Sequence, residues 1–119
     1  MKVFCQNIII NKLSFERNMK ELDNAGIEMG VIPELAKNRD ENEKKVRLEA
    51  EITIGEKGRT SFHCEMNIIS ILSWEGNSDN FDETIIKLGM PFIMSFARVK
   101  VFELCQQAGI KPVYLPELD

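Results

Sequence analysis

The sequence predicts an α+β fold in which a four-stranded antiparallel sheet carries two C-terminal helices packed on one face. Apolar and polar residues alternate over much of residues 1–75, which is typical of strands with one buried face. Apolar residues recur every three to four positions over 78–108, which is typical of helices. A chain of 119 residues is long enough for one modest core, so we expect a single domain over 1–119. Its last part, 109–119, holds two prolines among apolar residues and is here named the strap.

The clearest strand is 46–54, VRLEAEITI, in which apolar residues alternate with polar ones. The next, 61–74, alternates in its first half and is apolar on both faces in its second half, so it must be covered on both sides. Two less regular strands are expected within 2–16 and 26–37. Pro33 places the latter at a sheet edge or a bulge, because proline cannot donate to a ladder. Short links between these strands favour an antiparallel meander.

The helical part begins at Asn80, a residue suited to cap a helix, with an acidic residue three positions later. Gly89 is expected to end this first helix. Pro91 suits the first turn of a second helix over 91–108, and Gly109 suits the left-handed position after its end. The second helix is apolar around more than one face, which indicates self-association.

Composition excludes several classes of function. The formal net charge is −4 and no basic stripe occurs, so we expect no nucleic-acid partner. Three widely spaced cysteines without a CxxC indicate reduced thiols, and the single histidine, His63, leaves a metal site unsupported. Neither a signal peptide nor an apolar run of membrane-spanning length occurs. We therefore expect a cytoplasmic protein without membrane insertion, cofactor or metal.

Catalytic patterns are weak. Ser61, His63 and Glu65 alternate along one strand, and no oxyanion donor or nucleophile elbow accompanies them. Gly55 and Gly58 stand in a charged turn rather than before a helix, which is not a phosphate loop. We expect no enzymatic activity and no catalytic residue.

Three stretches in this order resemble SecB-type export chaperones. INKLSFERN at 10–18 is similar to the first-strand signature of that family. The stretch 46–76, which ends in SILSWEG, is similar to its central hairpin, and 90–119 to its long helix and the segment after it. In the last stretch Phe96 stands where the family has a tyrosine. The chain is thus identified as resembling a SecB-like chaperone without the usual tail.

The resemblance implies a function. Members of the family are cytoplasmic chaperones that hold unfolded polypeptides without ATP, as tetramers built from two dimers, in long apolar grooves. We therefore expect an ATP-independent holdase for unfolded or partly folded polypeptides, with protein export as its process. The translocase motor SecA or an antitoxin would be a further partner. The alternative is an interaction module of the same fold that serves one partner, such as an antitoxin or a phage protein; a dimer that binds a small ligand is a third hypothesis.

The resemblance also assigns residues to three surfaces. The groove for clients would be lined by Ile69, Ile71, Leu72, Trp74, Phe102, Val113, Tyr114 and Leu115. The oligomer interface would contain Cys64, Met66, Ile68 and Phe96, and the motor would dock on Glu16 and Glu65. The residue pattern alone leaves Ile69, Ile71 and Trp74 open between core, subunit interface and groove.

Two departures from the family limit these expectations. Lys12 stands where the motor-binding face commonly carries an acid. Because the sequence ends at Asp119, we expect neither the C-terminal helix of the family nor its basic, metal-binding tail.

Overall fold

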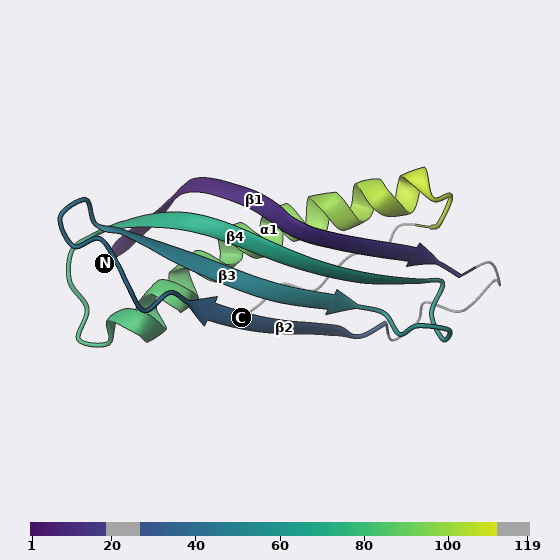
Figure 1. Cartoon of the computed structure of the whole chain (residues 1–119), viewed down its shortest axis with the longest axis horizontal. Helices are drawn as coiled ribbons and strands as arrows, with labels where there is room; N and C mark the ends of the chain where they lie inside the picture. The colour runs from purple at the N-terminus through teal and green to yellow at the C-terminus, as the bar shows by residue number, and fades with distance from the viewer. Residues whose placement is uncertain (19–26, 112–119) are drawn as a thin grey trace.

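Residues 1–18 and 27–111 are described in the computed structural model of the chain (Figure 1). They form an antiparallel sheet of four strands and a single long helix. The strands are β1 (Lys2–Arg17), β2 (Met29–Leu35), β3 (Lys45–Ile54) and β4 (Phe62–Glu75), and the helix is α1 (Phe81–Gln107). The four strands and the antiparallel sheet confirm the sequence prediction.

The order of the strands in the sheet is β1-β4-β3-β2. β2, β3 and β4 follow one another as hairpin-connected neighbours, whereas β1 pairs with β4 rather than with β2. The predicted meander is therefore wrong: the strands form a Greek key, in which β1 and β2 follow each other in the sequence but are separated in the sheet by β4 and β3. Consequently β1 and β2 are the two edges of the sheet.

A single helix replaces the two that the sequence predicts. Gly89 does not end a helix, because it is buried inside α1, where it packs against Leu72 and Leu48 of the sheet. Pro91 is an interior residue of α1 and does not begin a new helix. The local preferences of both residues favour a helix boundary, whereas packing of α1 on the sheet overrides these preferences.

The two ends of α1 match the sequence prediction in position. Asn80 is the residue before the first turn, but its side chain donates from Nδ2 to Glu83 Oε2 (2.6 Å) and caps no backbone N–H. At the other end, Gly109 has a φ of 71°. Its N–H donates to Gln106 O, and the next N–H, of Ile110, donates to Cys105 O (2.8 Å). This pair of bonds is a Schellman motif, which uses two carbonyl groups that the helix itself leaves unbonded.

The core lies between the inner face of the sheet and α1. Even-numbered residues of β3 and β4, from Val46 to Ile54 and from Phe62 to Trp74, point to this face and are buried. α1 crosses it diagonally, with its N-terminal end on the β2 side and its C-terminal end on the β1 side (Figure 1). The opposite face of the sheet, here named the outer face, carries the odd-numbered residues of these strands.

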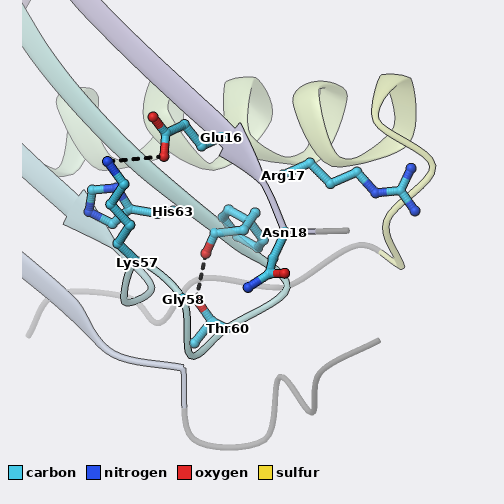
Figure 2. A pocket seen from close by; sticks show the side chains of 8 residues that line it. Glu16, Arg17, Asn18, Lys57, Gly58, Thr60 and His63 are labelled. Carbon is cyan, nitrogen blue, oxygen red and sulfur yellow. Dashed lines mark hydrogen bonds and ion pairs between the residues drawn. The ribbon is translucent and has the colours of Figure 1, made fainter. Parts of the chain in front are cut away.

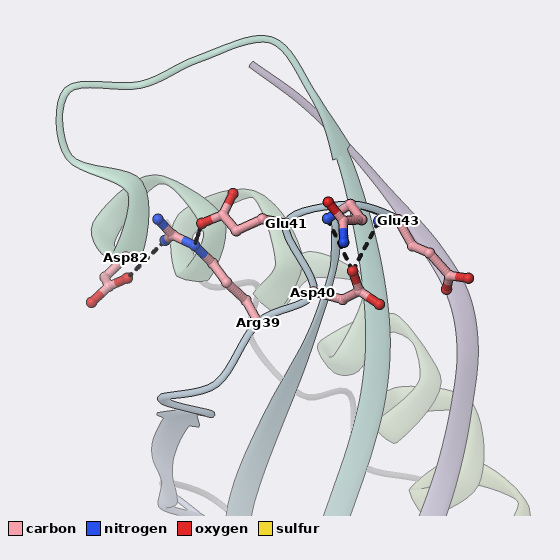
Figure 3. Close-up of polar contacts among 6 residues, drawn as sticks. Arg39, Asp40, Glu41, Glu43 and Asp82 are labelled. Carbon is pink, nitrogen blue, oxygen red and sulfur yellow. Dashed lines mark hydrogen bonds and ion pairs between the residues drawn. The ribbon is translucent and has the colours of Figure 1, made fainter.

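The first turn of α1 is attached to the end of the sheet by ring contacts. The rings of Phe81 and Trp74 meet edge to face at 4.8 Å, and the Arg39 guanidinium lies 3.8 Å from the centre of the Phe81 ring. Figure 3 shows Arg39 between Glu41, which it contacts through Nε, and Asp82, which lies 3.9 Å from Nη1. The connection between β2 and β3 thereby fixes the start of the helix. No helix of the described ranges has the length and apolar character needed to span a bilayer.

Candidate polypeptide-binding groove

An apolar pocket of about 370 Å³ opens between β2 and the first half of α1. Its walls, here named the β2–α1 pocket, are Val31, Pro33, Glu83, Ile86, Lys87, Met90 and Pro91. The two residues from β2 have odd numbers, so they lie on the inner face of the sheet beyond the part that α1 covers. Pockets that bind ligands are typically apolar with a few polar groups at fixed places, which describes this one.

The free edge of β2 runs along the same pocket. The N–H of Ala36 donates to Arg47 O (3.0 Å), and Leu35 lies opposite Leu48. Because hydrogen-bonded residues alternate in an antiparallel pair, the even-numbered residues of β2 bond to β3 and the odd-numbered ones point their backbone groups away from it. Within 1–18 and 27–111, no strand pairs with this edge. Residues that line the pocket therefore also present unbonded backbone groups beside it.

Pro33 occupies one of these outward positions. The N–H of any other residue at this position would point away from β3. Proline, which lacks that N–H, therefore leaves the hydrogen bonds between β2 and β3 intact. This finding confirms the expected edge position and gives its reason. The outward donors of β2 are the N–H groups of Met29, Val31 and Leu35, with a gap at Pro33.

Two charged side chains stand at the rim of the pocket, one helical turn apart. Glu83 accepts the hydrogen bond from Asn80 described above. Lys87 is exposed, and within the described part of the chain no carboxylate lies within ion-pair distance of it. The rim therefore carries one negative and one positive side chain.

The structure does not bring the expected groove residues together. Ile69 and Ile71 lie half-buried on the outer face, whereas Leu72 is 0% and Trp74 6% exposed in the core on the inner face. Successive residues of a strand point to opposite faces, so these two pairs cannot line one surface. Phe102 is half-buried on α1. Val113, Tyr114 and Leu115, with the strap from 112 onward, lie outside the described residues.

The residues expected at the oligomer interface are similarly divided. Cys64, Met66 and Ile68 are at most 1% exposed and belong to the core beneath α1, so they have no surface to offer a partner in this fold. Phe96 is half-buried on the helix. The exposed apolar residues of α1 are instead Leu88 (38%), Phe92 (39%) and Val99 (56%), which recur after four and seven positions and so share a face.

The outer face combines an apolar patch with a polar network. Ile9 lies opposite Ile69, with Phe4 and Ile71 nearby on the same two strands. Next to them, the buried amide of Asn67 donates to Glu49 Oε2 (2.9 Å) and to Glu51, and accepts from Asn11 Nδ2 (3.1 Å). All polar atoms of this amide are thereby satisfied, which is the condition for burying it.

Glu16 and Glu65, the residues proposed for motor docking, both lie on the outer face. Glu16 lies 3.5 Å from Lys57 Nζ, and Glu65 lies 3.7 Å from His63 Nε2. Figure 2 shows the pocket beside Glu16, where Arg17 extends toward the C-terminal end of α1. Arg17 Nη1 lies 3.8 Å from the position that a Cβ atom on Gly109 would take. Arg17 therefore supplies a cation at the end of α1, which has no basic residue in its last turn.

Chemically reactive groups are sparse in this site. The three cysteines, all within the described ranges, form no disulfide. Burial raises the pKa of the Cys64 thiol to about 11, with smaller contributions from Cys105 and Glu65, and burial also raises the pKa of Cys5. No group of three or more side chains with metal-ligating atoms occurs in 1–18 and 27–111.

A solved structure that bears the name of a SecB-like chaperone has a fold similar to the one described above. The chain superposes on the SecB-like chaperone Rv1957 of Mycobacterium tuberculosis, solved with a ChAD peptide from the Rv1956 HigA1 antitoxin, with a TM-score of 0.69. The superposition covers 99% of this chain and 88% of that one at 9% identity. A protein of unknown function from Streptococcus agalactiae superposes with a TM-score of 0.56 over 98% of both chains, at 18% identity.

The family resemblance expected from the sequence is confirmed by this likeness at the level of the fold. The sequence itself matches no family profile and no curated protein. The β2–α1 pocket was missed because its walls come from a short edge strand and from a helix segment that sequence reasoning divided at Gly89. The available signal was the pair Pro33 and Pro91, two rigid residues that the fold places at one opening.

Proposed function

We propose that the protein is an ATP-independent chaperone of the holdase type, which binds unfolded or partly folded polypeptides in the β2–α1 pocket and along the adjoining edge of β2. The single observation that carries this proposal is that the same residues form an open apolar pocket and a strand edge with which no strand of residues 1–18 and 27–111 pairs. The SecB-like fold supports it, because Rv1957 carries the name of a chaperone and holds a peptide in its solved complex. No catalytic step is part of the proposal.

The physical chemistry of the pocket suits promiscuous binding. Burial of apolar area contributes about 25 cal/mol per Å² whatever the order of the client side chains. Met90 lines the pocket and Met29 lies on the same strand face as Val31, and methionine adapts its shape to irregular partners. An outward strand edge accepts any extended backbone, since it bonds to the peptide groups that all sequences share.

Self-association forms a second part of the proposal. Leu88, Phe92 and Val99 expose apolar surface along one face of α1, and a second copy of the chain is the partner we propose for that face. A homo-oligomer, with a dimer of dimers as its expected form, would bury these side chains and leave the β2–α1 pockets open. Light scattering measures the mass; a monomer at micromolar concentration would contradict this part.

A dedicated role for one partner is the second candidate function. The observation that favours it is that the peptide bound to Rv1957 comes from an antitoxin. Under this alternative, capture from a cell lysate yields one stoichiometric protein, such as an antitoxin or a phage protein, whereas a general holdase retains many unfolded chains. Protein export, docking of SecA on Glu16 and Glu65, and location in the cytoplasm belong to the first candidate and are proposed with it.

The test is suppression of aggregation of a chemically unfolded client, followed by light scattering. Val31→Ser alters the pocket, and Ile9→Ser is the matched control, because both exchange a β-branched residue on an edge strand for serine. We expect Val31→Ser to raise the concentration needed for suppression several-fold and Ile9→Ser to leave it unchanged. No suppression by the unaltered protein at stoichiometric concentration would refute the holdase function.

A further inference from the structure

The outer face of β3 carries two positive side chains followed by two negative ones. Lys45 and Arg47 hold the first two outer positions of the strand, and Glu49 and Glu51 hold the next two. The residues between them are buried on the inner face of the sheet beneath α1. A half-turn about an axis that runs across the strand at Leu48 therefore exchanges each positive position with a negative one.

Apolar side chains lie at the same level on the two neighbouring strands. Ser70 of β4 pairs with Leu48, and Ile69 and Ile71 flank this serine on the outer face, where both are half-buried. Ile9 of β1 pairs with Ile69 and is 48% exposed. Contact between two such faces would remove this apolar surface from water, which is favourable.

We propose that the outer faces of two copies of the chain pack against each other about a two-fold axis at this level. The axis keeps β3 above β3 and reverses its direction, so Arg47 of each copy faces Glu49 of the other. Lys45 faces Glu51 in the same way, and Ile71 meets Ile69. The contact is independent of client binding, because the β2–α1 pocket opens on the inner face. Together with the apolar face of α1, it gives the two different contacts that a dimer of dimers requires.

The charged side chains nearest the axis are available for this pairing. Arg47 is exposed, and in the described part of the chain no carboxylate lies within ion-pair distance of it. Glu49 is half-buried and is held in place by the hydrogen bond that Asn67 Nδ2 donates to it (2.9 Å). Lys45 lies 3.4 Å from Glu43, but both side chains are exposed, and such a pair contributes little to stability.

A second copy fits these charges better than a partner of a single charge. An acidic or a basic partner would pair with two of the four side chains of β3 and repel the other two, whereas a reversed copy pairs with all four. The same charges exclude a two-fold axis along the strands, because that axis would place like charges at the same level.

The match ends away from the centre of the face. Glu65 and Glu75 of β4 lie equally far from Ser70 on the outer face, so each would face the other across the contact. The twist of each sheet moves the ends of two packed faces apart. The contact is therefore confined to the central positions.

Complementary charge reversal tests the contact through the mass of the particle. The measurement uses a Phe92→Glu background, which places a charge on the apolar face of α1. We expect this protein to be a dimer by light scattering, and either Arg47→Glu or Glu49→Arg to halve its mass. An equal mixture of the two variants should form dimers again, because each facing pair then joins an arginine to a glutamate. A monomeric background protein, or a mixture that stays monomeric although both variants fold by circular dichroism, would overturn the inference.

Cross-linking of the unaltered protein tests the outer pair of charges without a substitution. A carbodiimide joins an amine to a carboxylate that touches it. Lys45 and Glu51 are about 20 Å apart along one strand, so a link between them forms only between two copies. We expect this link, with one isotope-labelled side, when labelled and unlabelled protein are mixed. Links from Lys45 to Glu43 alone would overturn the contact, whereas suppression of client aggregation, measured separately, decides the holdase function.

Discussion

Gly89 and Leu72 are so close that a Cβ atom on the glycine would lie 2.5 Å from Leu72 Cδ1. The same Cβ would lie 3.0 Å from Leu48 Cδ2, and both leucines are fully buried. The helix therefore approaches the sheet here more closely than any residue with a side chain would allow. Since Met90 and Pro91 follow directly, this contact also sets how far the wall of the β2–α1 pocket stands from β2.

The first prediction concerns this contact. Gly89→Ala gains about 1 kcal/mol of helix propensity, but overpacking of a core site typically loses about 1–3 kcal/mol. We expect a net loss of about 1 kcal/mol in the free energy of unfolding, measured with urea. In a Leu72→Ala background the closer of the two contacts is removed and only that with Leu48 Cδ2 remains, so the same change at Gly89 should lose less stability. Equal effects in both backgrounds would show that the two residues do not interact.

The second prediction concerns the buried amide on the outer face. Asn67 is 3% exposed and holds Glu49 and Glu51 through one NH₂ group. We expect Asn67→Leu to lose about 2 kcal/mol of stability, since it removes donors from two carboxylates. Asn67→Asp should lose more at neutral pH, because a third carboxylate joins them, and added salt should reduce the difference. Equal stabilities of the two variants would contradict this explanation.

The third prediction uses Trp74, the single tryptophan of the chain. Phe81→Ala should red-shift the tryptophan emission, because the Phe81 ring covers the indole of Trp74. The same variant should lose about 2 kcal/mol of stability, because it also removes the contact between the Phe81 ring and the Arg39 guanidinium. Phe4→Ala is the control, as Phe4 is partly exposed on the outer face. An unshifted emission after Phe81→Ala would mean that the ring does not shield Trp74.

The fourth prediction concerns the effect of pH on the stability that the Cys64 thiol contributes. Burial raises the pKa of Cys64 from 9.0 to about 11 in the folded protein, so the folded state favours the neutral thiol. The stabilisation is fully present below pH 9 and is lost as the pH rises from 9 to 11, because the unfolded chain gives up this proton first. The stability difference between the unaltered protein and Cys64→Ala should therefore fall across this interval. A constant difference would exclude Cys64 as a contributor.

The strands could be predicted from the sequence because their signal is local. Alternation over 46–54 and 61–74 located β3 and β4 within one residue at each end. β1 was found as well, although it contains bulges near Gln6 and Asn11 that break strict alternation. These two insertions keep Val3, Ile8 and Phe15 on the inner face, even though the parity of their numbers changes.

The order of the strands and the unity of the helix could not be predicted in the same way. Pairing of β1 with β4 depends on contacts between residues far apart in the chain, which short connections do not encode. Gly89 carries the same local preference whether it ends a helix or lets one approach a sheet, and only Leu48 and Leu72 decide between the two. Leu72 and Trp74 cannot share a groove with Ile69 and Ile71, because even- and odd-numbered residues of β4 point to opposite faces of the sheet.

The central claim is that clients bind in the β2–α1 pocket. Its most direct test is the methyl spectrum of the isotope-labelled protein, recorded while a permanently unfolded polypeptide is added. If clients bind in the pocket, the methyl signals of Ile86 and Met90 change their chemical shifts, while those of Ile9 and Ile69 on the outer face remain unchanged. Shifts confined to the outer face, or none anywhere at saturating polypeptide, would contradict the claim.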